Sequence, residues 1–116
     1  LGKHQITYVA AQHTATALQR NSTLTTLGLG SNQITDVGAQ HIATALQSNS
    51  TLTALDLSIN PIADVAQHIA TALQCNSTLF ALYLSYSKIA DVGAQHIATA
   101  LQANSALTEL DLSCNQ

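Results

Sequence analysis

Charged side chains are scarce in this chain of 116 residues, of which only 8% are Asp, Glu, Lys or Arg, compared with roughly a quarter in an average globular domain. Three basic residues and a net charge of −3 offer no positive surface for nucleic acid or for anionic lipid. No apolar run reaches the length of a membrane span, and no signal peptide opens the chain. We therefore expect neither a nucleic-acid partner nor a membrane partner.

Cysteine is almost absent as well. Cys75 precedes an Asn-Ser-Thr turn and Cys114 precedes the final asparagine, so the two do not occupy equivalent positions. Two unmatched cysteines are more typical of free thiols in a reducing compartment than of a disulfide or a metal site. The cysteine content therefore predicts a cytoplasmic protein.

What the chain has instead is one stretch that recurs. It begins at Asn21 and begins again at Asn49, Asn76 and Asn104, at spacings of 28, 27 and 28 residues. Inside it stands the pattern Leu-x-x-Leu-x-Leu-x-x-Asn, and that pattern at a period of about 20–29 residues indicates a solenoid of stacked repeats. The apolar content of 47% is sufficient for the core of one domain.

The repeats divide the chain into one domain, residues 1–116, with three full units and a partial unit at each end. The full units are 21–48, 49–75 and 76–103, and the partial units are 1–20 and 104–116. Terminal repeats of solenoids are usually atypical and polar, because an ordinary end repeat exposes its core. Neither end has this character, so we expect a fragment of a longer protein whose flanking repeats continue the stack.

Two hydrophobic periods alternate within each unit. The Leu-x-Leu segment has period two and predicts a short strand with one buried face. Ala39, Ile42, Ala43 and Leu46 fall at i, i+3, i+4 and i+7, the apolar stripe of an amphipathic helix. Strands pair at about 4.8 Å whereas helices pack at about 8–10 Å, so the stack must bend. The predicted fold is an α/β horseshoe with parallel strands on the concave side and helices on the convex side.

Polar residues at fixed places predict how the helices and loops are held. Asp91 is suited to cap a helix N-terminus, as are Asp64 and either Thr35 or Asp36. The asparagine that opens each unit is suited to end the preceding helix.

The motif's last asparagine, as at Asn60 and Asn115, predicts hydrogen bonds to buried loop backbone. Ser87 replaces it in the third unit, which predicts a looser loop there. Pro61 and a missing glycine distinguish the unit 49–75, where we expect a local kink and an unbroken apolar stripe.

This unit resembles the ribonuclease-inhibitor-like class of leucine-rich repeats. The matching residues are Leu24, Leu27, Leu29, Asn32, Gly38, Ala39, Ile42, Ala43 and Leu46. The class includes the ribonuclease inhibitor, the Ran GTPase-activating protein and sensor regions of nucleotide-binding innate immune receptors. The Asn-Ser-Thr-Leu turns are most similar to those of the receptors. The resemblance implies a right-handed horseshoe that is cytoplasmic, holds no cofactor and binds proteins.

Two repeated features suggest chemistry, and a structural explanation is favoured for both. A histidine recurs on the outer side of each helix, as His13, His41, His68 and His96. Neighbouring helices lie about 8–10 Å apart, too far for two histidines that must each approach a zinc ion to about 2 Å, so we expect a solvated column. Asn-Ser-Thr occurs three times and matches the glycosylation pattern, but the asparagine is better explained as the end of a helix.

The candidate binding surface is the concave row with chemical character. Its residues are Asp56, Tyr83, Tyr86, Glu109 and Asp111. Exposed aromatic residues beside acids are common interface anchors. An aspartate before the third leucine is frequent in this repeat class, so Tyr83 and Tyr86, which depart from the repeat pattern, are the stronger candidates.

No constellation predicts catalysis, because the chain has no nucleophile turn, no phosphate loop and no paired carboxylates in a pocket. The favoured function is a non-catalytic protein-interaction or ligand-sensing module within a larger cytoplasmic receptor or scaffold. One alternative is a GTPase-activating regulator, which calls for a suitably placed arginine. The only arginine, Arg20, is predicted at a helix end on the outer side. A purely structural spacer is the other alternative.

Overall fold

The computed structural model describes residues 8–21, 23–30, 34, 36–60, 62, 66–113 and 115. Helices and short strands alternate along the chain. In order they are α1 (Tyr8–Arg20), β1 (Thr26–Gly28), α2 (Asp36–Ser48), β2 (Ala54–Asp56), α3 (Ala66–Cys75), β3 (Ala81–Tyr83), α4 (Asp91–Ala103) and β4 (Glu109–Asp111).

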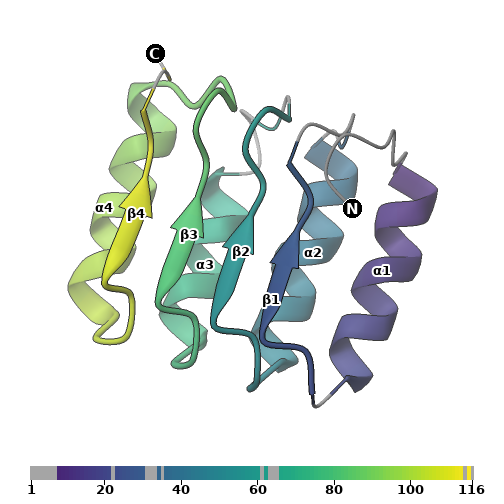
Figure 1. The fold of residues 1–116 in the computed structure, drawn as a ribbon. Coiled ribbons are helices and arrows are strands. Elements are labelled where there is room, and N and C mark those ends of the chain that lie inside the picture. Colours follow the sequence, from purple (N-terminus) through teal and green to yellow (C-terminus); the bar gives the residue numbers. More distant parts are fainter. Residues whose placement is uncertain are drawn as a thin grey trace.

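The four strands form one parallel sheet in the order β1-β2-β3-β4, so each strand lies beside its neighbours in sequence. Figure 1 shows all four helices packed on the same face of this sheet, each helix next to the following one. The central leucines of the strands are in register, Leu27 with Leu55, Leu55 with Leu82, and Leu82 with Leu110. The structure is therefore the predicted arc of parallel strands and outer helices.

The core lies between the sheet and the helix layer. Leu55 and Leu82 are almost fully buried beneath α3 and its neighbours, and the residues on either side of Leu55 in β2 are only half-buried. The helical stripe of α2 is covered as predicted, since Ala39, Ile42 and Leu46 have at most 1% of their surface exposed. Each fully buried leucine or isoleucine contributes about 1.5–3 kcal/mol, so the repeated leucines account for most of the stability.

Burial falls off at both ends of the stack. Leu24 is 38% exposed, whereas Leu52 and Leu79, at the same place in the next two repeats, are fully buried. At the other end Leu107 is half-buried, and Ala98 of the predicted α4 stripe is exposed. The sequence pattern predicted a buried residue at each of these positions. The prediction was wrong at Leu24 and Ala98 because a repeat position is covered only where a neighbouring repeat lies against it.

The unit 49–75 keeps its apolar stripe despite the missing glycine. Helix α3 has ten residues, against thirteen in α2 and α4, and Ala66, Ile69 and Leu73 are each about 1% exposed. The predicted kink falls on residues 63–65, which lie outside the described residues. No helix in the described part of the chain is long and apolar enough to cross a membrane.

A column of asparagines joins the C-terminal end of each helix to the next repeat. The Asn76 Nδ2 donates to the carbonyl oxygens of Leu46 and Asn49 at 2.9 and 3.0 Å, and its Oδ1 accepts from the backbone N–H groups of Thr78 and Leu79. Asn49 and Asn104 make the corresponding bonds. Asparagine ends each helix as predicted, but Asn104 is extended (φ −106°). Its side chain, not a left-handed backbone, satisfies the free carbonyls.

A second column follows the strands. The Asn60 Nδ2 donates to the carbonyl oxygens of Leu29, Leu57 and Ser58, and Asn115 makes the equivalent bonds one repeat beyond Ser87. The Ser87 hydroxyl donates to the same Leu57 carbonyl at 3.4 Å, and the side chain is fully buried.

The loop at Ser87 is therefore held, which corrects the prediction that it is loose. The shorter side chain makes a longer bond to Leu57, but the Oδ1 of Asn115 accepts from the N–H groups of Ser87 and Ile89 at 2.9 Å. A neighbouring repeat thus supplies the acceptor that orders this loop.

The predicted cap at Asp91 was wrong. Helix α4 begins at Asp91, its N-cap is Ala90, and no side chain caps it. Asp91 lies in the first turn, where a negative charge favours the helix dipole by about 0.3–1 kcal/mol. Asp64 and Thr35 lie outside the described residues, and α2 already includes Asp36.

Candidate functional site

The sheet has one face that no described helix covers, which we call the concave face (Figure 1). Its side chains come from the strand residues on either side of each buried central leucine. They are Thr26 and Gly28 in β1, Ala54 and Asp56 in β2, Ala81 and Tyr83 in β3, and Glu109 and Asp111 in β4. Small neutral residues therefore lie at the β1 end of this face, and aromatic and acidic residues lie at the β4 end.

Tyr83 is at the centre of the acidic part. It pairs in register with Asp56 on one side and Asp111 on the other. Its hydroxyl donates a hydrogen bond of 2.7 Å to the Glu109 Oε2. This bond is the main reason that the pKa of Tyr83 is raised above its usual 10.0, and desolvation and the charges of Glu109, Asp56 and Asp111 add to the effect. The structure thus places four of the five predicted site residues together.

The two aspartates also hold the turns that follow their strands. The Asp111 Oδ1 accepts from the backbone N–H and the hydroxyl of Ser113 at 2.9 and 2.6 Å. These bonds lower the pKa of Asp111 below its usual 3.8. The Asp56 Oδ1 accepts from the Ser58 N–H in the same way. Both residues therefore have a structural reason to recur in the repeat, as their consensus character suggested.

Tyr86 does not lie in the strand row. It is 59% exposed and occupies the loop after β3, with φ of 55°. Ile59, one repeat earlier, has φ of 59°, so the left-handed turn belongs to the loop and not to tyrosine. The placement of Tyr86 in the same row as Tyr83 was therefore wrong. It stands beyond the C-terminal end of the strand, at the rim of the concave face.

Sequence reasoning missed Phe80, which immediately precedes β3 and is 49% exposed. The corresponding residues in the other repeats are Thr25, Thr53 and Thr108. A departure from the repeat pattern identified Tyr83 and Tyr86, and the same signal would have found Phe80. The third repeat thus carries three aromatic residues in succession along one strand and its two ends.

The repeated histidines and Asn-Ser-Thr sequences take structural places. His13 and His68 are exposed, and His41 and His96 are half-buried, so the expected solvation is only partial for the latter two. In the described part of the chain, no group of three His, Cys, Asp or Glu residues could hold a metal ion.

The asparagine of two of the glycosylation patterns is inside the fold. Asn49 and Asn76 are each 5% exposed, and the Nδ2 of each donates two hydrogen bonds. A glycan on that nitrogen would remove these bonds. The turn explanation therefore fits both residues better than glycosylation does.

A family model described as "Leucine Rich repeat" matches residues 20–43, 48–66, 75–98 and 103–116, which together make up more than half of the chain. The chain belongs to the leucine-rich repeat family. Its alternation of strands and helices fits the ribonuclease-inhibitor-like type of that family. Repeats of this family typically form non-catalytic surfaces for protein interaction, and the matched model is not one of an enzyme family.

Among solved structures, the leucine-rich repeat chain is similar to one entitled "Leiomodin-1 Actin-Binding Site 2 (ABS2)". The TM-score is 0.88 at 27% sequence identity, over 97% of this chain and 68% of that chain. A comparison with curated protein sequences finds no match. Arg20, which a GTPase activator would require on the binding side, is the last residue of α1 in the helix layer and not on the concave face.

Proposed function

We propose that this leucine-rich repeat chain is a non-catalytic interaction module that binds a protein partner on its concave face, as part of a larger cytoplasmic receptor or scaffold. The residues assigned to the contact are Asp56, Tyr83, Tyr86, Glu109 and Asp111. The observation that carries the proposal is the bond from Tyr83 to Glu109. It holds an aromatic side chain in one orientation, on a sheet face that no described helix covers.

Pre-orientation of this kind favours binding, because less side-chain entropy is lost when the partner arrives. Tyr83 stands between the exposed Phe80 and Tyr86, so a partner that spans β3 meets aromatic area at three successive levels. Aromatic residues supply most of the energy at protein interfaces. Three carboxylates beside Tyr83 favour a partner that presents lysine or arginine, since complementary charge raises the association rate and selects the partner.

The first partner to test is actin, because the similar leiomodin-1 structure is entitled an actin-binding site. Co-sedimentation with actin filaments, and binding to monomeric actin, would measure this directly. The full-length protein should also be used to capture partners from a lysate, followed by identification and a binding curve with each purified candidate.

The decisive comparison uses a matched pair of variants. Tyr83→Ala combined with Tyr86→Ala should weaken binding of the confirmed partner at least tenfold, which corresponds to the loss of about 1.4 kcal/mol. His68→Ala, an exposed residue on the helix side, should leave binding unchanged. Unchanged binding by the double variant would remove the site assignment, provided that both variants retain the wild-type thermal transition.

A further inference from the structure

Every helix carries two alanine positions that face its neighbours in the stack. At the first position, Ala45, Ala72 and Ala100 are fully buried, but Ala17 in α1 is exposed. This position is covered in every helix except the first, so it contacts the preceding repeat.

The second position shows the opposite trend. Ala15, Ala43 and Ala70 are at most 6% exposed, whereas Ala98 in α4 is exposed. This position is covered in every helix except the last, so it contacts the following repeat. The stack therefore has two different end faces, and each presents a surface that is buried everywhere else in the molecule.

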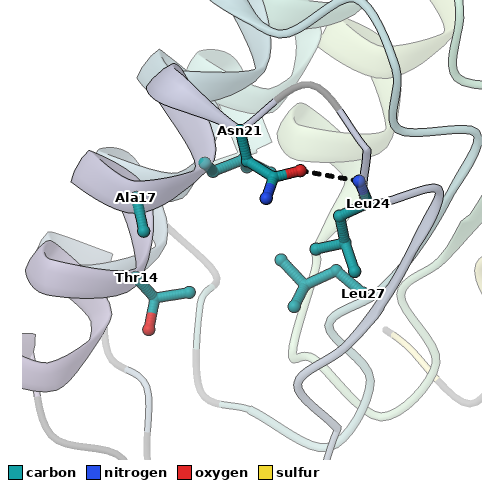
Figure 2. A pocket seen from close by; sticks show the side chains of 6 residues that line it. Thr14, Ala17, Asn21, Leu24 and Leu27 are labelled. Atoms are coloured by element: carbon teal, nitrogen blue, oxygen red, sulfur yellow. Dashed lines mark hydrogen bonds between the residues drawn. The ribbon is translucent and has the colours of Figure 1, made fainter.

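The face formed by α1 and β1, here called the α1–β1 face, is hollow. A cavity of about 250 Å³ opens there, lined by Thr14, Ala17, Leu18, Asn21, Leu24 and Leu27. Figure 2 shows these side chains converging from the helix, from the turn after it and from β1. The lining is mostly apolar, and β1 is an edge strand with a described neighbour on only one side.

The polar groups of this face are incomplete in the same way. The Asn21 Oδ1 accepts from the N–H groups of Thr23 and Leu24, as every asparagine of the helix-end column does. Its Nδ2, however, donates to no residue that the structure describes. In Asn49 the same atom reaches the carbonyl oxygens of Leu18 and Asn21 in the preceding repeat.

The opposite face, formed by α4 and β4 and here called the α4–β4 face, offers what Asn21 lacks. The carbonyls of Leu101 and Asn104 occupy the repeat positions that Leu18 and Asn21 hold at the first junction. Ala98 is exposed, and Leu101, Leu107 and Leu110 are only half-buried. Strand β4 is the other edge of the sheet, and an unpaired edge is a ready template for another strand.

We propose that copies of this chain associate head to tail, with the α4–β4 face of one copy seated on the α1–β1 face of the next. The occupant is a second copy because the two faces are those that already meet at each junction inside the molecule. Asn21 of one copy donates to Leu101 and Asn104 of its neighbour, and Leu24 fills against the neighbour's apolar stripe. Strand β1 pairs with the neighbour's β4, which continues the sheet across the junction.

Such a contact is heterologous, because two different surfaces meet, and it leaves one free face of each kind at the ends of every assembly. Contacts of this type do not stop at a dimer unless the rotation closes a ring. The chain is therefore expected to form a concentration-dependent series of oligomers. The concave face remains open throughout, so this inference does not depend on the proposed function.

The test is sedimentation velocity over a hundredfold range of concentration with residues 1–116 and two variants. Ala17→Arg places a charged side chain on the α1–β1 face, and Ala98→Arg places one on the α4–β4 face. Each position is exposed and arginine is a good helix former, so both variants should keep the helical circular dichroism of the wild type. Each variant alone should lose at least tenfold in self-association, and Gln74→Arg, on the outer side of α3, should behave as the wild type.

The mixture of the two variants gives the sharpest result. The Ala17→Arg copy retains an intact α4–β4 face and the Ala98→Arg copy retains an intact α1–β1 face, so an equimolar mixture should form a 1:1 dimer that grows no further. Restored pairing also shows that both variants are folded. A wild type that stays monomeric at the highest concentration, a variant that still forms the full series, or a mixture that remains monomeric would each overturn the proposal.

Discussion

The interior and terminal repeats have nearly the same sequence but different surroundings. Leu52 in the second repeat is fully buried, Leu24 at the same position in the first is 38% exposed, and Leu107 in the last is half-buried. Asn49 and Asn76 satisfy both ends of their amides, whereas the Asn21 Nδ2 bonds to no described residue. Burial and hydrogen bonding in this molecule thus belong to the junction between two repeats more than to either repeat. Stability in such a stack is close to a sum over units and their nearest-neighbour junctions.

The largest expected effect comes from cavities on either side of this difference. Leu55→Ala removes a side chain that is 1% exposed and flanked by strands on both sides, so we expect a loss of about 2–5 kcal/mol. Leu110→Ala, at the same position in the edge strand β4, should cost less than half as much. Urea denaturation of the two variants at one protein concentration measures both values. Equal losses would show that the terminal junction is as well packed as the interior one.

The next effect concerns the asparagine column. Asn76→Ala removes four hydrogen bonds and leaves buried carbonyl and N–H groups without partners, so a loss of about 1–3 kcal/mol is expected. Asn21→Ala removes only the two bonds of its own exposed turn and should cost well below half of that. Thermal and urea unfolding of both variants test the ratio. A larger loss at Asn21 would contradict the view that the bonds between repeats are the important ones.

The smallest effect links an interior strand to the terminal one. The hydrogen bond to Glu109 raises the pKa of Tyr83, and Glu109→Gln removes the charge. Spectroscopic titration of tyrosinate should therefore show that the raised pKa of Tyr83 falls back toward 10.0 in this variant. Tyr83→Phe identifies which titration step belongs to this residue, and an unchanged pKa in Glu109→Gln would contradict the assignment.

The same shift sets the sign of a small pH dependence of stability. The folded state keeps the Tyr83 proton to a higher pH than the unfolded state does, so this stabilisation is fully present below the unfolded pKa near 10. It is lost as the pH rises through the raised folded pKa. The Tyr83→Phe variant should lack this component of the alkaline decline.

The repeat period was enough to predict the strands, the helices and their parallel order. That success has a physical cause, because each unit can bury its leucines only against a copy of itself. The errors occurred where a neighbour is missing or where a neighbour supplies the partner. Leu24 and Ala98 fit the apolar pattern and are nevertheless exposed, and Ser87 was expected in a loose loop although Asn115 from the next repeat holds it.

The candidate site was only partly readable from the sequence. Aligning the repeats places Asp56, Tyr83 and Asp111 in one row, and this follows from the strand register. The bond from Tyr83 to Glu109 is diagonal across two strands, and a pattern of single positions does not contain it. Helix α4 shows the same limit, because a side chain suited to capping predicts a cap only when the helix begins one residue later.

The helix-end asparagine column has a consequence for how such a protein can change in length. Each of these asparagines holds its own turn with the Oδ1 and the preceding helix with the Nδ2, so a segment that runs from one asparagine to the next contains half of each junction. The 27-residue unit makes the same bonds as the 28-residue units, because its missing residue lies before the helix. A gene that gains, loses or exchanges whole units cut at these asparagines therefore preserves every junction, and the number of repeats can drift while the fold of each repeat stays unchanged.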